Sequence, residues 1–172
     1  MPDIVSVEYQ QTGNSKSTNQ YGMREMQERA FEYRDSQYIL LKSPPASGKS
    51  RALMFLGLDK LFNQGQKKLI VSVPERSIGA SFEPTKLTED GFFADWEYDD
   101  HFNLCTPGSD KSKVGQFKAF IENKSATILI CTHATLRFAF EQIQIDQFND
   151  LLLTIDEFHH VSASEDSRLG EV

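Results

Sequence analysis

Short apolar runs alternate with amphipathic stretches along most of the chain. The runs are rich in aliphatic and aromatic residues, which is typical of buried strands, and they lie at 37–42, 69–73, 102–105, 127–131 and 151–155. The amphipathic stretches repeat apolar positions at helical spacing and predict helices at 21–31, 51–62, 113–123 and 134–140. Because strands that alternate with helices form parallel β-α-β units, the pattern predicts a three-layer α/β/α domain with a mainly parallel sheet.

Two segments depart from this alternation. Residues 1–20 are polar and rich in Gln, Ser, Asn and Thr, and we interpret them as an N-terminal arm. Residues 83–100 interleave acidic and aromatic residues, which indicates an irregular insertion or a short hairpin on the surface, an acidic loop held by a few aromatics. We expect the remainder, 21–172, to be one domain, and it ends without a final strand, as a truncated domain would.

The composition favours a single domain with a real core and an acidic surface. A chain of 172 residues is close to the size of one domain, about 150 residues. The hydrophobic fraction of 39% with 13 Phe excludes wholesale disorder. Lys and Arg number 18 against 25 Asp and Glu, so the net charge is 18 − 25 = −7. A generally basic surface is therefore excluded, and any contact with phosphates must be local.

The cysteines and the N-terminal sequence favour a cytoplasmic protein. Cys105 and Cys131 lie in apolar runs, which is typical of buried thiols in a reducing compartment and not of a disulfide framework or a metal site. The N-terminus has no basic-then-apolar signal, and no apolar stretch approaches the roughly 18 residues that cross a bilayer. We therefore expect no membrane contact.

Residues 43–50 (SPPASGKS) lie between a predicted strand and a predicted helix, the place where a phosphate-binding loop occurs. Gly48 permits close approach of the backbone, Lys49 supplies a cation for the phosphates, and Ser50 supplies a hydroxyl for Mg²⁺. Three further residues complete the predicted cradle: Pro45, Ala46 and Ser47.

The loop departs from the strict glycine-rich pattern. Ser43 stands at the first glycine position, and Ala46 is bulkier than the glycine often found at its place. The tripeptide Gly-Lys-Ser by itself also occurs by chance in turns. The strand before it, the helix after it and a second, acidic motif favour a nucleotide site, with ATP and Mg²⁺ as ligands.

The acidic motif follows the last apolar run. Residues 151–155 (LLLTI) predict a buried strand, and Asp156 and Glu157 come where this strand ends. The carboxyl ends of parallel strands form the usual ligand edge of an α/β sheet. Asp156 is suited to hold Mg²⁺ through water, and Glu157 to orient or activate the attacking water. Such acids alone often cap the next helix, so the interpretation depends on the phosphate loop upstream.

Together these motifs resemble the first RecA-like domain of a superfamily two helicase or translocase. Residues 156–159 (DEFH) resemble the DEAD/DEAH box, with Phe158 in place of the usual small residue, and the closest similarity is to the restriction-enzyme-like branch. The similarity covers roughly residues 21–160 and implies a P-loop NTPase fold.

The resemblance implies roles for four further residues. In residues 73–76 (VPER), Arg76 matches an arginine that contacts nucleic acid, although Glu75 replaces the usual threonine. In residues 131–136 (CTHATL), Thr132 matches a threonine that meets a strand phosphate. Gln27 resembles the glutamine that reads adenine. His159 would couple the catalytic site to domain motion, and Lys49 and Glu157 would be the other two catalytic residues.

Each of the weaker matches has a plain structural alternative. Gln27 is also explained as a surface helical glutamine, Arg76 as an ordinary helix-start residue, and Thr132 as a cap at the end of a strand. Tyr33 and Trp96 are interpreted as packing aromatics, since no basic residues are interleaved with them.

The resemblance implies an ATP- and Mg²⁺-binding motor domain that acts on nucleic acid, DNA rather than RNA. It also implies a second RecA-like domain, in cis or in trans, without which hydrolysis by the chain would be weak or absent. The acidic charge does not exclude nucleic acid, because such proteins contact the backbone largely through amides, hydroxyls and helix N-termini. Two alternatives stay open: a P-loop ATPase or kinase that ignores nucleic acid, and a silent nucleotide-binding module.

Overall fold

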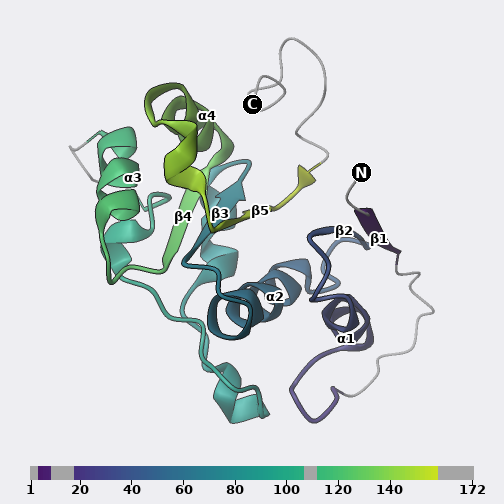
Figure 1. The fold of residues 1–172 in the computed structure, drawn as a ribbon. Coiled ribbons are helices and arrows are strands. Elements are labelled where there is room, and N and C mark those ends of the chain that lie inside the picture. Colours follow the sequence, from purple (N-terminus) through teal and green to yellow (C-terminus); the bar gives the residue numbers. More distant parts are fainter. Residues whose placement is uncertain (1–3, 9–17, 107–111, 159–172) are drawn as a thin grey trace. The chain divides into compact units, whose positions relative to one another are not determined.

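Two parallel sheets accompanied by helices form the structure, a computed structural model that describes residues 4–8, 18–106 and 112–158 (Figure 1). The chain divides into two compact units. Met1–Gln64 and Pro84–Trp96 form the N-terminal unit, and Gly65–Glu83 and Glu97–Val172 form the C-terminal unit. All strand pairs are parallel in the described residues, which confirms the predicted α/β class.

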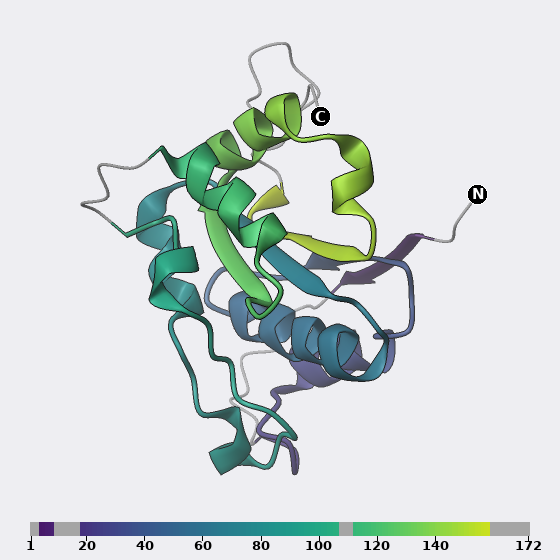
Figure 2. The ribbon, with the colours of Figure 1, turned by 60° about the vertical axis from the view of Figure 1, so that its left-hand side comes forward.

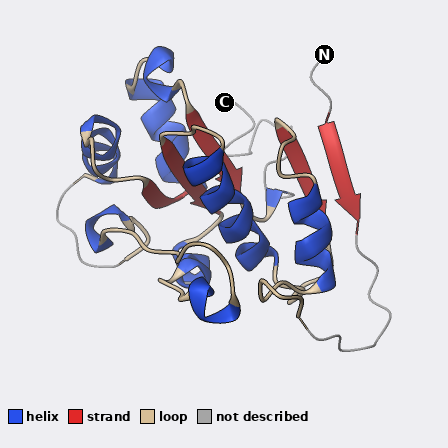
Figure 3. Ribbon diagram, turned by 60° about the horizontal axis from the view of Figure 1, so that its bottom comes forward, coloured by secondary structure: helices blue, strands red, loops and turns tan. Residues whose placement is uncertain are grey.

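The N-terminal unit holds a two-stranded sheet and two α-helices. Its elements are β1 (Ile4–Glu8), α1 (Glu25–Glu32), β2 (Tyr38–Lys42), α2 (Lys49–Asn63) and the 3-10 helix η2 (Leu87–Asp90). The strands β1 and β2 run in the same direction, with Val5 opposite Ile39 and Val7 opposite Leu41 (Figure 3). The helices α1 and α2 pack against each other.

The strand β1 lies in the segment that the sequence analysis interpreted only as an N-terminal arm. Val7 is 5% exposed, and with Ile4 and Val5 it forms a short apolar run in the otherwise polar arm. A strand of five residues obtains its ladder hydrogen bonds from a partner, here β2, and not from its own sequence. The pairing with β2 therefore gives this short run a regular structure that the sequence analysis did not predict.

The helix α1 begins four residues later than predicted. Asn19 Oδ1 accepts hydrogen bonds from the backbone N–H of Tyr21 (2.9 Å) and of Met23 (3.0 Å), which favours a turn over a helix. Gly22 has a φ of 72°, the left-handed region that a helix interior does not use. The turn therefore delays the helix to Glu25.

The C-terminal unit holds a three-stranded sheet in the order β4-β3-β5. Its elements are β3 (Lys68–Val73), η1 (Arg76–Phe82), η3 (Asp100–Phe102), α3 (Lys113–Glu122), β4 (Ile128–Thr132), α4 (His133–Gln142), η4 (Ile145–Phe148) and β5 (Leu151–Ile155). The strand β3 pairs with β4 on one side and β5 on the other, so it is the central strand.

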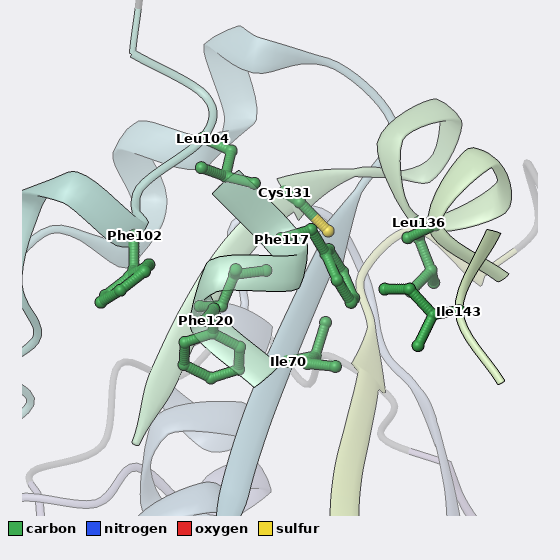
Figure 4. Close-up of a cluster of buried hydrophobic side chains, with 10 residues drawn as sticks. Ile70, Phe102, Leu104, Phe117, Phe120, Cys131, Leu136 and Ile143 are labelled. Carbon is green, nitrogen blue, oxygen red and sulfur yellow. The ribbon is translucent and has the colours of Figure 1, made fainter. Parts of the chain in front are cut away.

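An apolar core fills the space between α3, α4 and this sheet. The helices α3 and α4 lie side by side (Figure 2). Phe117 and Phe120 of α3 are fully buried with Ile70 of β3 and Leu136 of α4 (Figure 4). The alternation of side chains along a strand sends Ile70 and Ser72 to one face and Val71 to the other. The core thus holds α4 and its N-terminal residues against β3.

The predicted strand at 102–105 is wrong. Only a single parallel bridge joins Asn103 to Ile130, and Leu104 N donates to Ile130 O (2.8 Å). The Asn103 side chain explains the difference, because its Oδ1 accepts from Cys105 N (3.1 Å) and its Nδ2 donates to Tyr98 Oη (3.2 Å). An asparagine that bonds the backbone two residues ahead favours a turn over an extended strand.

The acidic segment after η1 is held by buried apolar side chains, including the aromatics that were predicted to hold it, but it contains the helix η2 and a bridge between Thr85 and Trp96 and is not a solvated loop. Trp96 and Leu87 have no exposed surface, which confirms Trp96 as a packing residue. Tyr33 differs, because its side chain is 46% exposed at the end of α1.

Within the described ranges, no helix has the length and apolar character needed to span a membrane.

Candidate nucleotide-binding site

The phosphate loop leaves β2 at Lys42 and enters α2 at Lys49, as the sequence predicts for a strand-loop-helix unit. Ser47 N donates to Pro44 O (3.4 Å), so the loop contains a turn. Ser43, at the first glycine position, lies with its Oγ 2.7 Å from Ser47 Oγ. This bond joins the two ends of the loop, a function that glycine could not perform.

Two loop residues adopt the left-handed backbone conformation. Gly48, the N-cap of α2, has a φ of 90°, and Ala46 has a φ of 59°. This conformation costs glycine nothing and costs alanine about 1–2 kcal/mol. Pro45 and Ala46 are exposed, whereas the loop is half-buried from Ser47 onward.

Gln27 joins α1 to the phosphate loop. Its Nε2 donates to Gly48 O (3.1 Å), and its Oε1 accepts from Arg24 N (2.8 Å). A Cβ atom at Gly48 would lie 2.4 Å from Gln27 Nε2, so no larger residue fits there without displacing the amide. Gln27 is 2% exposed, so the alternative of a surface glutamine is wrong.

The first turn of α2 carries positive charge without an acid. Lys49 and Arg51 lie in this turn, and no acidic residue does. The first turn of α1, in contrast, contains Glu25 and Glu28. Carboxylates stabilise a helix N-terminus and cations destabilise it, so Lys49 is suited to an anion there, while Arg51 pairs with the carboxylate of Asp90. The charge of Lys49 therefore fits a phosphate group.

The acidic motif lies in the C-terminal unit, directly after β5. Asp156 N donates to Ser72 O (2.9 Å), which extends the pairing with β3. Asp156 is 5% exposed, and its Oδ1 accepts from Glu157 N (3.0 Å). Glu157 has a φ of 53°, so the chain turns sharply at the end of the strand. The geometry fixes the direction of the Asp156 carboxylate.

The strand that carries this motif is less buried than its sequence predicted. Leu153 is 39% exposed, and only Thr154 of β5 is buried. The reason is position: among the described strands β5 pairs with β3 alone and lies at the edge of its sheet. Three leucines and an isoleucine were typical of a central strand, but they occupy an edge here.

Ser72 and His133 form a buried link that the sequence analysis missed. Ser72 Oγ and His133 Nδ1 lie 2.7 Å apart, and both residues are buried. Ser72 also contacts Asp156 through its backbone, while His133 is the first residue of α4. A polar residue within an apolar strand, at the position before its end, was the signal that could have indicated this link.

Arg76 and Thr132 follow neighbouring strands of the same sheet. Val73 of β3 lies opposite Thr132 of β4, and Arg76 begins η1 soon after Val73. Both candidates therefore lie at the carboxyl edge of this sheet. Arg76 is exposed, whereas Thr132 is half-buried and caps α4, its Oγ1 accepting from Thr135 N (3.2 Å).

Lys113 is a further cation at this edge that sequence reasoning missed. It begins α3, and its Nζ donates to Thr106 O (3.3 Å). Burial lowers the pKa of Lys113, and the positive charge of Arg76 lowers it further. The two cations are therefore close enough to influence each other, which concentrates positive charge in an otherwise acidic chain.

The structure brings some predicted site residues together and not others. It joins Gln27 to Gly48 and places Thr132 opposite Val73, the last residue of the strand that precedes Arg76. The phosphate loop belongs to the N-terminal unit and the acidic motif to the C-terminal unit. His159 lies outside the described residues. No group of three or more His, Cys, Asp or Glu residues in the described part of the chain could hold a metal ion.

Comparisons with known proteins define the class and then the family. The parallel α/β fold is that of a RecA-like P-loop domain. Residues 7–170 match ResIII, described as "Type III restriction enzyme, res subunit". The chain belongs to this family, which confirms the resemblance to the restriction-enzyme-like branch of the helicases.

One relative is much longer than the chain and matches all of it. The Bacillus subtilis (strain 168) protein "Putative ATP-dependent helicase YeeB" is 62% identical over 172 residues. These are 100% of this chain and 28% of that protein, so the chain spans little more than a quarter of its relative. No solved structure matches the chain.

Proposed function

We propose that the chain is the nucleotide-binding motor domain of a nucleic-acid-dependent helicase or translocase. The N-terminus of α2 carries this proposal, because the left-handed Gly48 and the lysine that follows it, Lys49, together fit a bound phosphate. Membership of the ResIII family and the helicase name of the relative support it. We expect the protein in the cytoplasm.

Each part of the phosphate loop would contact a different part of the ATP and Mg²⁺ ligand. The backbone N–H groups of 46–48 would contact the phosphate oxygens, Lys49 would neutralise their charge, and Ser50 would contribute a ligand for Mg²⁺. ATP with Mg²⁺ supplies the phosphoryl group whose transfer to water drives the motor.

The acidic motif would complete the chemistry. Asp156 is the second proposed Mg²⁺ ligand, and Glu157 is proposed to orient or deprotonate the attacking water. A magnesium ion held by one carboxylate, one hydroxyl and phosphate oxygens does not need a cage of protein acids. His159 is proposed to couple this motif to domain motion. A second RecA-like domain would supply the rest of the site.

Gln27 is proposed to read adenine. Within the described part of the chain, its two hydrogen bonds use one of two lone pairs on Oε1 and one of two hydrogens on Nε2. The remaining acceptor and donor match the N6 amino group and the N7 acceptor of adenine. Because the side chain is 2% exposed, the base can reach it only after a local movement of the residues that cover it.

Nucleic acid, DNA in preference to RNA, is the proposed partner of the carboxyl edge of the three-stranded sheet. Arg76, Thr132 and Lys113 would contact backbone phosphates there. The substitution Arg76→Ala should weaken binding of all sequences alike and reduce the slope of log affinity against log salt by about one. Arg29→Ala, which removes an exposed arginine of α1, is the matched control and should change neither quantity.

ATP hydrolysis by the full-length protein tests the proposal directly. The rate is measured without nucleic acid and with single-stranded DNA, double-stranded DNA or RNA. We expect stimulation by nucleic acid, loss of nucleotide binding in Lys49→Ala, and loss of hydrolysis with retained binding in Glu157→Gln. A basal rate that ignores nucleic acid would instead support an ATPase with another substrate, and binding without turnover would support a silent module.

A further inference from the structure

Residues 84–96 belong to the N-terminal unit although their neighbours on both sides in the sequence belong to the C-terminal unit. The segment closes on itself, because Thr85 N donates to Trp96 O (2.9 Å) and Trp96 N donates to Thr85 O (3.0 Å). Trp96 and Leu87 have no exposed surface. The segment is therefore a folded part of the unit that holds the phosphate loop, and not an acidic loop left in solvent.

Phe92 is the residue of this segment that contacts both helices of the unit. Its ring centroid lies 5.8 Å from that of Phe31 in the α1 helix and 4.7 Å from that of Phe55 in the α2 helix, both with edge-on geometry. Phe92 is 5% exposed. A rigid ring between two helices sets their separation, because close-packed side chains leave little room for adjustment.

The separation of these helices matters for the nucleotide site. The α1 helix carries Gln27, and the α2 helix begins directly after Gly48. The 3.1 Å bond between Gln27 Nε2 and Gly48 O exists only at one spacing of the two helices. Phe92 therefore packs between the two helices whose spacing determines whether the Gln27 amide reaches the phosphate loop.

Close backbone approach fixes the same segment against the entry to α1. A Cβ atom at Gly91, whose φ is 96°, would lie 2.2 Å from Gln20 O. A Cβ atom at Gly22 would lie 2.4 Å from Asp90 Cβ. Neither position has room for a side chain, so residues 90–91 and 20–22 lie against each other along their backbones.

A second attachment reaches the first turn of α2. Asp90 Oδ2 pairs with Arg51 Nη2, two residues after Lys49. The side chains are 50% and 35% exposed, and ion pairs of such exposure contribute little stability. The pair instead orients the Arg51 side chain, because it holds the guanidinium of Arg51 at the 84–96 segment.

We propose that Phe92 and Asp90 are positioning residues of the nucleotide site and that the segment 84–96 sets its preference for adenine. The inference rests on the proposed function, since it requires that Gln27 reads the base. Phe92 holds α1 at the distance from α2 at which the Gln27 amide contacts Gly48 O, so that a base admitted by a local movement would meet the remaining donor and acceptor of this amide. Asp90 holds the first turn of α2 in place.

The ratio of ATP to GTP affinity in the full-length protein tests this role. Fluorescence titration should give wild-type preference for ATP and a preference about tenfold smaller in Phe92→Ala, since losing one hydrogen bond to the base has about that effect. Phe92→Leu, which keeps most of the apolar volume, should restore much of the preference. Phe138→Ala is the matched control, because Phe138 is 49% exposed and lies in α4 of the C-terminal unit.

A merely structural role predicts a different result. It would lower the unfolding temperature of Phe92→Ala and leave the ATP to GTP ratio unchanged well below that temperature, which would overturn the inference. If the alanine variant does not fold, Phe92→Leu decides: an unchanged ratio there also overturns it. Equal affinity of the wild-type protein for ATP and GTP would overturn base reading by Gln27 together with this inference. Absence of any nucleotide binding would overturn the proposed function itself.

Discussion

Ala46 occupies a backbone conformation that glycine would adopt more easily. Its φ of 59° costs about 1–2 kcal/mol for a residue with a Cβ atom, and its side chain is exposed, so little packing opposes a change. Glycine increases the entropy of the unfolded chain, which offsets about 0.5–1 kcal/mol of the gain. We expect Ala46→Gly to raise the free energy of unfolding by about 0.5–1 kcal/mol.

Denaturant unfolding with an unchanged slope measures this effect. The matched control is Ala119→Gly, which places glycine at an exposed position inside α3 and should destabilise by about 1 kcal/mol. A loss of stability in Ala46→Gly similar to that of the control would contradict the assignment of strain to the loop.

Cys105 should react slowly with thiol reagents. Burial raises its pKa to about 11, although the charges of Lys113 and Arg76 act in the opposite direction. At pH 8 the thiolate is then about 0.1% of the thiol, and the rate should rise about tenfold per pH unit towards pH 11. The rate is measured in a Cys131→Ala variant, which leaves Cys105 as the single thiol. Equal rates for folded and urea-unfolded protein at pH 8 would sink this prediction.

Single residues were predicted well where their chemistry is local and poorly where it depends on partners. The glycine, lysine and serine of the loop lie at the start of α2 as expected, because strand, loop and helix are consecutive in the chain. The link from Ser72 to His133 was not predicted, because 61 positions separate the two residues and only the packing of α4 on the sheet brings them together.

At the scale of elements, the link between Ser72 and His133 attaches α4 to β3. Removing the Ser72 hydroxyl takes away a hydrogen-bond partner of a buried imidazole, which costs about 1–3 kcal/mol. We expect Ser72→Ala to lower the free energy of unfolding by this amount. Ser77→Ala, at an exposed position of η1, is the control and should have little effect. In a double-mutant cycle with His133→Ala, strictly additive losses would show that the bond contributes nothing.

Helices and most strands were predicted from periodicity because each is a local pattern. The exceptions depend on contacts that hydrophobic periodicity does not reveal. The strand β1 depends on pairing with β2, the segment at Asn103 follows a side-chain hydrogen bond, and β5 lies at an edge although its sequence is that of a central strand. In each case a tertiary partner or a single polar contact decided the outcome.

At the scale of the whole molecule, the segment 84–96 is expected to stabilise the unit it packs in. Trp96, Leu87 and Phe92 contribute buried surface to the N-terminal unit, although their sequence neighbours lie in the other. Replacing 84–96 with a Gly-Ser linker should therefore reduce hydrogen-exchange protection in α1 and α2 and leave β3 and β4 protected. Lost protection confined to the three-stranded sheet would contradict the division into units.

The sequence by itself determined the parallel α/β class, the phosphate loop between a strand and a helix, and the acids at the end of the last strand. These features are local: hydrophobic periodicity, turn chemistry and short motifs act over a few residues. The tertiary structure alone decided that β1 pairs with β2, that Gln27 reaches Gly48, and that the acidic segment joins the unit of the phosphate loop. Such contacts join residues distant in the chain, and they form only when buried apolar surface holds whole elements together.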